Sequence, residues 1–518
     1  TTICTIALLS MVTAASAQSN YYYTNEALRY ADNVTVGSAR TLAMGNAFTA
    51  LGGDLGAIAI NPAGIGVFNH SEAAISFGLD MASSSSMYGG GQSSRNMGRF
   101  TIPNVGLVMS FDTGRRRGLV SNNIAFALNK VNDYNSKLNV NGVNNNTSWV
   151  ASRGVNYGDY YENNAMYLNS ANLAWNTTLL KYHYNGNYYT AAEVAQNPNL
   201  IPDGAQYDVI ASTENMENGD IFVGGPLIQD YFKKTHGGQY EFAVNYAANI
   251  SDWLYLGANL NLYSIDYVGF EQYMEDAQKT SDFQDAFDGF TYLNEQKTSG
   301  IGLNFKVGAM ATLGGFRLGA SVSTPPWYSM SEDWNESIAA SFSNGSEQQY
   351  SNAYGSCDYQ MVTPFRFSLG AAYVFGRVGL ISFDYESANF YHSKLADNLG
   401  NNSEFSAENS FISRNIGFVD IYRLGGELNL GPTLLRAGYM HYNYGGFDKS
   451  VYYPAKKYIS FGVGIPFGRA GEFDIAYQRQ LPQKSYNLLY DDYIPEYSAQ
   501  YYLKSNTSRI IATLTFKF

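Results

Sequence analysis

The 518-residue chain has few of the residues from which enzyme sites and disulfide frameworks are built. It holds 2 cysteines and 5 histidines. Cys4 lies in an apolar N-terminal segment, so the rest of the chain has only Cys357 and cannot form an internal disulfide. The histidines do not occur at metal-ligand spacing, and neither a nucleophile elbow nor a phosphate-binding glycine loop is present. We therefore predict a protein that is not an enzyme and that binds no metal and no cofactor.

Charged side chains are also scarce, at 15% of the chain, and the net charge of −12 argues against a nucleic-acid partner. Beyond residue 17 there is no apolar run of the length that a membrane-spanning helix needs. Residues 1–17 are apolar and end in Ala15-Ser16-Ala17, the pattern of a signal peptide with its cleavage site. We expect the mature chain to begin near Gln18 and the protein to be exported.

Aromatic residues and glycine are abundant, with 44 Tyr, 30 Phe and 51 Gly. Several segments alternate between apolar and polar side chains, as in Val378–Glu386, Tyr422–Leu430, Glu472–Gln478 and Arg509–Phe518. This period of two is typical of a β-strand with one apolar face and one polar face. Weak hydropathy together with high aromatic content favours a transmembrane β-barrel, whose apolar face contacts lipid and whose polar face lines the lumen.

The connections between these segments are alternately short and long. Short turn signals lie at Thr113–Gly118, Ser251–Asp252, Gly314–Gly315, Gly376–Arg377, Gly431–Pro432 and Gly468–Gly471. Long polar connections are expected at 81–101, 135–238, 273–298, 325–360, 392–420, 445–456 and 481–505. This alternation predicts 14 antiparallel strands with short periplasmic turns and both termini on the periplasmic side. The second loop, near 135–238, far exceeds ordinary loop lengths, so we expect a shielding lid or a glycan-binding surface there.

Before the first predicted strand lies Gly37–Phe68, a stretch dominated by glycine and alanine with almost no charge. Small side chains let a backbone pack closely against walls on several sides. Asp54 is placed to cap a short helix over 55–60, and Asn61 to cap a following turn that begins at Pro62. The sequence thus predicts an all-β fold, a 14-stranded antiparallel transmembrane barrel of residues 71–518 with a plug of residues 18–70 in its lumen.

These features resemble the FadL/TodX family of outer-membrane transporters for hydrophobic compounds such as long-chain fatty acids. The residues that carry the resemblance are Gly45, Ala47–Asp54, Asn61-Pro62-Ala63-Gly64, the Thr-Pro element Thr324–Tyr328 and the terminal Phe518. The resemblance implies a plug role for the motif residues Asn61, Pro62, Ala63 and Gly64. It also implies that the barrel-assembly machinery reads a C-terminal signal formed by Phe516 and Phe518.

In that family the ligand is collected in an outer groove and leaves sideways through a gap beside a kinked third strand. The resemblance therefore implies passive uptake of hydrophobic or amphipathic small molecules by a monomer in contact with outer-membrane lipid. The third predicted strand, Leu119–Asn132, contains no Gly or Pro, so nothing in it indicates a kink. Two alternatives stay open, a surface-assembly or secretion partner and a polar-solute porin. The plug argues against an open pore, and the large second loop favours a partner.

An apolar ligand needs apolar surface that the polar lumen face of the strands does not supply. We predict that six plug residues provide a ligand-binding surface: Leu42, Met44, Phe48, Leu51, Ile65 and Phe68. Five charged residues of neighbouring strands are expected to face the lumen, as a network that holds the plug or as a polar constriction: Asp384, Glu386, Arg423, Glu427 and Arg436.

Overall fold

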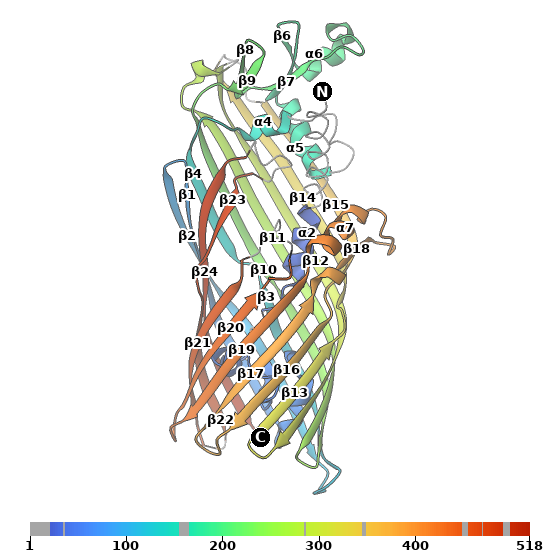
Figure 1. Cartoon of the computed structure of the whole chain (residues 1–518), viewed down its shortest axis with the longest axis vertical. Coiled ribbons are helices and arrows are strands. Elements are labelled where there is room, and N and C mark those ends of the chain that lie inside the picture. Colours follow the sequence, from blue (N-terminus) through green and yellow to red (C-terminus); the bar gives the residue numbers. More distant parts are fainter. Residues whose placement is uncertain are drawn as a thin grey trace.

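The computed structural model describes residues 21–34, 37–154, 165–283, 286–343, 349–447, 454–468, 470–490 and 498–518. The expected signal peptide, residues 1–17, lies outside these ranges. The described chain forms one tall barrel of tilted strands, with the C-terminus at the end where the short turns lie (Figure 1). Helices occur inside the barrel and over its opposite, outer end.

Fourteen strands form the wall, and five of them are interrupted, so that each of these five consists of two segments. In chain order they are β1 (Glu72–Tyr88), β2 (Gly91–Asp112), β3 with β4 (Leu119–Asp133, Ser136–Asn144), β10 (Leu227–Ile250), β11 (Leu254–Ala277), β12 (Phe287–Leu313), β13 with β14 (Phe316–Ser323, Trp327–Phe342), β15 with β16 (Gln349–Val362, Arg366–Val374), β17 with β18 (Gly379–Asn389, Lys394–Asp397), β19 (Phe418–Asn429), β20 (Leu434–Asn443), β21 (Lys456–Pro466), β22 with β23 (Gly471–Gln480, Gln483–Leu488) and β24 (Gln500–Lys517).

The barrel is closed by its first and last strands. β1 pairs antiparallel with β24 from Glu72–Lys517 to Met87–Tyr502, and every other neighbouring pair in the wall is antiparallel as well. Closure removes the unpaired edges that an open sheet would expose. The predicted 14-stranded antiparallel barrel is confirmed, and so are the short turns between β2 and β3, β10 and β11, β12 and β13, β16 and β17, β19 and β20, and β21 and β22.

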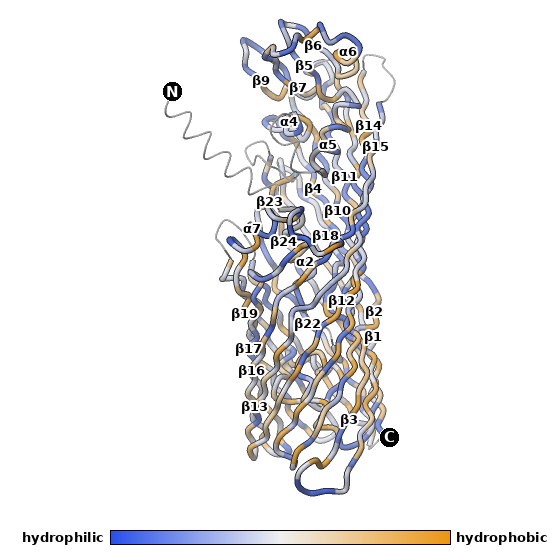
Figure 2. Tube along the Cα trace, turned by 90° about the vertical axis from the view of Figure 1, so that its right-hand side faces the viewer, coloured by the Kyte–Doolittle hydropathy of each residue, from blue (hydrophilic) through white to orange (hydrophobic). Residues whose placement is uncertain are grey.

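The outer surface of the wall changes character with height. Near the short turns, outward side chains are large and apolar, as at Leu256, Leu260 and Leu262 of β11. Further along the same strand they become polar, for example at Asp266. The tube in Figure 2 shows apolar residues recurring along the lower strands. We call this lower zone the apolar belt. No helix among the described residues is both long and apolar enough to cross a membrane.

Three of the predicted long loops are wrong. The ranges 81–101, 273–298 and 325–360 are largely strand, because β1, β2, β11, β12, β14 and β15 continue far beyond the apolar belt. In the first of them, only Gly89 and Gly90 form the turn between β1 and β2. Above the belt the outward side chains are mostly polar, while the inward positions mix hydroxyl, amide and acidic groups with buried rings such as Tyr273 and Phe290. The alternation that marks a strand with one apolar face is therefore lost.

The segment expected to form the plug lies in the lumen, with α2 near mid-height and its other turns in the lower half of the barrel (Figure 1). It consists of α2 (Tyr21–Ala31), α3 (Ala39–Ala43) and two 3₁₀ turns, η1 (Leu55–Ala59) and η2 (Pro62–Val67). The predicted caps are present, since the Asp54 carboxylate accepts a hydrogen bond from the Gly56 amide and the Asn61 side chain accepts one from Ala63. Residues 18–20, 35 and 36 of the expected plug lie outside the described ranges.

The outer end of the barrel carries the remaining helices and short strands. Between β4 and β10 the chain forms α4 (Trp149–Gly154), α5 (Ala165–Asn176), β5 (Leu180–Tyr184), β6 (Asn187–Tyr189), α6 (Ala191–Gln196), η3 (Pro198–Leu200), β7 (Asp208–Ala211), β8 (Glu214–Glu217) and β9 (Asp220–Val223). Other connections hold η4 (Thr280–Asp282), η6 (Phe390–His392) and α7 (Ser406–Asn415). The second long loop is therefore a folded cap, anchored where the Trp149 ring lies 4.9 Å from that of Tyr292.

The two ends of the barrel predict different access to reagents added outside intact cells. Asn145 follows β4 at the outer end, whereas Arg116 lies in the turn between β2 and β3, and both are exposed. With Cys357 replaced by Ser, an impermeant thiol reagent should label Asn145→Cys and spare Arg116→Cys until the membrane is permeabilised. The opposite labelling pattern would reverse the orientation of the barrel.

Candidate transport path

The plug is seated on a ring of inward-facing glycines in the barrel wall. A Cβ atom on any of these glycines would lie within 3.0 Å of a plug atom, closer than real Cβ contacts allow. At Gly319, for example, the wall backbone lies directly against the carbonyl group of Thr49. The glycine ring consists of Gly257, Gly308, Gly319, Gly370, Gly425, Gly438 and Gly462, from seven strands. Absence of side chains at these positions thus lets the plug approach the wall closely on seven of its fourteen strands.

Polar wall side chains satisfy the plug's backbone between these glycines. Asn123 donates to the carbonyl of Ile65 at 2.6 Å, and Asn259 donates to that of Ile58 at 2.9 Å. Asn61 itself donates to the carbonyl groups of Thr49 and Ala309, so it joins two plug turns to the wall. Buried backbone groups need such partners. The structure places Pro62, Ala63 and Gly64 in η2 beside Asn61, all buried; their role as a plug motif stays a prediction.

Two of the predicted charged residues meet the plug near its base. Glu427 of β19 contacts both Arg40 of the plug (3.0 Å) and Arg436 of β20 (2.6 Å). Arg436 also pairs with Glu472 and Asp474 of β22. The Arg436 side chain is buried, and a buried charge is tolerated only where it is paired in this way. One plug cation is therefore part of a network that spans three strands.

The other three predicted charges lie in two further places. Asp384 accepts a hydrogen bond from the backbone amide of Thr49 at 2.7 Å. Glu386 pairs with Arg423 at 2.6 Å and with Arg366 at 2.9 Å, and Arg366 donates to the carbonyl of Ala31 at the end of α2. The structure thus brings all five residues to the lumen in three separate groups, each in contact with the plug or with a residue that contacts it.

The six plug residues predicted to bind ligand do not form one surface. Leu42 packs with Ala476 and Ile511 of the wall, while Met44, Phe48 and Leu51 pack in a second cluster against Ala372. Ile65 and Phe68 belong to a third cluster on β2, β3 and β10. None of the six side chains is more than 4% exposed. The structure gives them a packing role between plug and wall, and ligand contact by these residues remains a prediction.

A larger buried aromatic cluster lies higher in the lumen, around α2, and was not anticipated from the sequence. Rings from the wall gather against Tyr30, whose centroid is 5.7 Å from that of Tyr134 and 6.4 Å from that of Tyr267. Several of the ring hydroxyl groups have polar partners, as Tyr263 does in Glu241 at 2.6 Å. We call this group the tyrosine belt: Tyr30, Tyr134, Tyr263, Tyr267, Tyr328, Tyr359, Tyr442, Tyr444 and Tyr458, all buried.

The wall has a break in its backbone ladder beside the tyrosine belt. β2 and β3 pair from Asp112–Ser121 up to Asn104–Asn129 and no further. Above that point the described part of β2 pairs with β1, and β4 pairs with β10. We call the boundary between upper β2 and β4 the lateral seam. Ser93 donates a hydrogen bond to the Asn141 side chain across it at 2.9 Å, and at its upper end the Val143 amide donates to the Gly89 carbonyl at 3.3 Å. The seam is therefore closed by scattered hydrogen bonds and not by a continuous backbone ladder.

The lateral seam begins at the height of the apolar belt. Phe100 and Ile102 of β2, directly above the last ladder pair, point outward and are 64% and 40% exposed. On the inner side, the break between β3 and β4 falls at Tyr134 and Asn135, and Tyr134 belongs to the tyrosine belt. The seam therefore lies between the tyrosine belt inside the lumen and the lipid-facing side of the wall.

The structure interrupts the third predicted strand between β3 and β4, although nothing in the sequence of that strand indicates a kink. β3 contains no Gly or Pro, but the neighbouring strands do. Gly237 of β10, whose φ is 125°, accepts a hydrogen bond from Tyr134 at the break, and Pro103 of β2 directly follows the last ladder pair. A residue in that region of φ is strained unless it is Gly, and Pro cannot donate to a ladder. The Pro and Gly residues near the break therefore lie on the two strands that flank β3, in β2 and β10, and not in β3 itself.

Comparison with known proteins bears on the architecture. The chain matches no protein-family model and no curated protein. Among solved structures, the toluene transporter TodX of P. putida aligns over 93% of this chain and 98% of its own, with a TM-score of 0.53 and 10% identity. A FadL homologue of Pseudomonas aeruginosa aligns over 94% of this chain and 100% of its own, with a TM-score of 0.54 and 11% identity. The fold is that of the FadL/TodX barrels.

A FadL/TodX-type barrel with an apolar belt around its outer wall is an outer-membrane protein. The wall meets the bilayer through its belt, and the polar upper strands stand above it.

Proposed function

We propose that this FadL/TodX-type barrel admits hydrophobic or amphipathic small molecules, such as long-chain fatty acids, by passive diffusion. The ligand passes the tyrosine belt and leaves through the lateral seam into the outer leaflet, while the plug keeps the route to the periplasmic end closed. Transport of toluene by TodX, which shares the fold, supports a hydrophobic cargo.

One observation carries the proposal. The tyrosine belt and the lateral seam meet at Tyr134, at the height of the apolar belt. A hydrophobic molecule on this route exchanges aromatic surface for lipid without entering water, so no large desolvation barrier arises. An open polar porin does not fit, because the glycine ring seats the plug directly on the wall.

Binding to the purified protein should depend on the apolar length of the ligand. Burial of each CH₂ contributes about 0.8 kcal/mol, so affinity should rise about four-fold per CH₂ until the surface is filled. A series of fatty acids, measured by displacement of a fluorescent probe, tests this expectation. Tyr134→Ala with Tyr267→Ala should weaken binding about ten-fold, because the binding free energy lost is about that of one aromatic contact with the ligand.

Tyr439→Ala with Tyr477→Ala is the matched control, since both rings lie on the outer face and are 36% exposed. It should bind like the unchanged protein. Equal, weak binding of every chain length would contradict the proposed cargo. Saturable binding of a protein partner in the absence of any fatty-acid binding would instead favour a surface-assembly role for the folded cap.

A further inference from the structure

Two arginines of β2 line the lateral seam. Arg99 donates a hydrogen bond to the side-chain oxygen of Asn135 at 3.1 Å, and Arg95 donates one to that of Asn139 at 3.2 Å. Arg95 also donates to the Ser94 carbonyl at 3.3 Å. Both arginines are exposed, and neither forms an ion pair with any residue that the structure describes. A guanidinium has five N–H donors, so most of the donors on each arginine remain available to a ligand.

The carboxylates that share this part of the wall already have cationic partners. Asp80 lies opposite Arg99 in the β1–β2 ladder, but its carboxylate contacts Lys130 at 2.7 Å and Arg509 at 3.2 Å. Asp133 contacts the same Lys130 at 3.3 Å. This group holds three cations and two carboxylates, and Arg99 is the cation without a carboxylate partner. Its uncompensated charge favours the approach of an anion.

The two arginines mark the upper border of the apolar belt on β2. Phe100 and Ile102, directly below Arg99, are the outward apolar residues that end the belt on this strand. Above Arg99 the exposed side chains of β2 are polar, as at Asn96. Arg95 lies four residues further along, about 13 Å at a rise of about 3.3 Å per residue. Arg99 is therefore at the level where hydrocarbon gives way to headgroups, and Arg95 is within the headgroup layer.

On the inner side of the seam, Arg99 is next to the tyrosine belt. Its partner Asn135 directly follows Tyr134 in the break between β3 and β4. The Tyr134 ring lies 5.7 Å from that of Tyr30 and 5.8 Å from that of Tyr267. An apolar chain that leaves these rings through the seam therefore meets Arg99 as its first cation.

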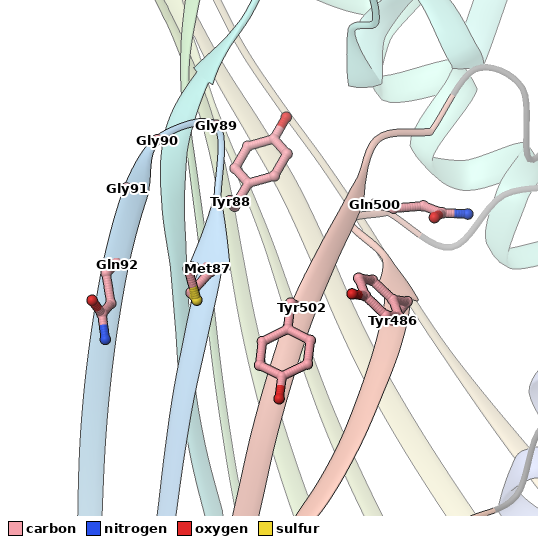
Figure 3. Close-up of a pocket in the computed structure, with 9 residues that line it drawn as sticks. All are labelled: Met87, Tyr88, Gly89, Gly90, Gly91, Gln92, Tyr486, Gln500 and Tyr502. Atoms are coloured by element: carbon pink, nitrogen blue, oxygen red, sulfur yellow. The ribbon is translucent and has the colours of Figure 1, made fainter.

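The upper end of the seam is packed more tightly than this lower end. Figure 3 shows the tip of the β1–β2 hairpin, where residues 89–91 are all glycine and border an open pocket. A Cβ on Gly91 would lie 2.2 Å from the Asn141 carbonyl oxygen of β4, so the two backbones are in close contact there. At the lower end, Arg99 and Asn135 are joined by one hydrogen bond between side chains. The seam can thus open at Arg99 with the least loss of contact.

We propose that the lateral seam selects amphiphiles with an anionic head, and that Arg99 and then Arg95 bind this head as the apolar chain leaves the lumen. The inference rests on the proposed transport and names the class of its cargo, a long-chain carboxylate. A guanidinium binds a carboxylate through two parallel hydrogen bonds. With the head at Arg99, the chain extends along Phe100 and Ile102 into the hydrocarbon layer. A fatty acid in the outer leaflet has the same orientation, whereas a neutral hydrocarbon gains nothing from the arginines.

Uptake of palmitic acid and of cetyl alcohol by cells that carry the protein tests the inference, because the two ligands have chains of equal length and differ in charge. Rates are taken above those of cells without the protein and divided by the amount of folded barrel in the outer membrane. Arg95→Gln with Arg99→Gln should lower the ratio of acid to alcohol uptake about ten-fold, as expected for one lost charge-assisted contact. Arg95→Lys with Arg99→Lys keeps the charge and should restore part of the ratio.

Arg115→Gln with Arg116→Gln is the matched control. It removes the same charge from the exposed turn between β2 and β3, at the other end of the barrel, and should leave the ratio unchanged.

An unchanged ratio in the Arg95/Arg99 glutamine variant would overturn the inference. An equal fall in the uptake of both ligands would overturn it too, since the arginines would then only shape the seam. Uptake of the alcohol but not of the acid by the unchanged protein would contradict the inference and leave the passage of hydrophobic molecules intact. Uptake of neither ligand would refute the proposed transport and, with it, this inference.

Discussion

A disulfide across the lateral seam should reduce uptake of a hydrophobic ligand to the level of cells without the protein. Ser93 of β2 and Asn141 of β4 are joined by a hydrogen bond of 2.9 Å between their side chains. With Cys357 replaced by Ser, oxidation of Ser93→Cys with Asn141→Cys should link the two strands. No backbone ladder joins these two strands, so they can part. Passage of a ligand through the seam requires that they do. Uptake should return on reduction.

The matched control is a second cysteine pair, Ser299→Cys with Ser331→Cys, at paired and exposed positions of β12 and β14. Here the backbone ladder is continuous, so oxidation should not alter uptake. Fatty-acid binding by the purified, oxidised Ser93/Asn141 variant should be retained, which separates exit from binding. Undiminished uptake in that variant after complete oxidation would mean that the ligand leaves by another route.

Replacement of Gly425 by Val should unseat the plug and make the barrel leak small polar solutes. Gly425 of β19 belongs to the glycine ring, and a Cβ there would lie less than 3.0 Å from the Met44 carbonyl. The cost of such overpacking is about 1–3 kcal/mol and falls on the plug contact, since the wall ladder is unchanged. Liposome swelling with the refolded variant measures the leak.

Gly426, the next residue of the same strand, is the control. It points away from the plug, and a Cβ there would lie 3.7 Å from its nearest neighbour, the Leu380 carbonyl, which is an ordinary contact. Gly426→Val should therefore assemble and stay sealed. If both valine variants swell alike, or neither does, then close seating on the glycine ring does not seal the lumen.

Local patterns predicted much of this fold because they report local physics. Alternation in Tyr422–Leu430 or Arg509–Phe518 reflects a strand with lipid on one side and a polar lumen on the other, and the structure has β19 and β24 there. Asp54 and Asn61 cap the turns that follow them, because each side chain reaches an amide two residues ahead. The same logic failed for 81–101, where the strands leave the bilayer and the outward side chains become mostly polar.

The tyrosine belt and the lateral seam are each assembled from strands far apart in the chain. Tyr134 packs against the rings of Tyr30 and Tyr267, which come from the N-terminal helix α2 and from β11. Which side chains gather depends on register, and register is set by pairing along whole strands.

The sequence by itself determined the class of fold, the number of strands and the presence of a plug, because hydrophobic period, turn residues and caps act within a few residues of one another. Only the tertiary structure decided where the wall parts. The ladder between β2 and β3 ends at Asn104 and Asn129, next to Pro103 of β2, and no pattern within β3 predicts that end. It likewise decided that Leu42, Phe48 and Ile65 pack in separate clusters, since burial depends on the wall that each one meets.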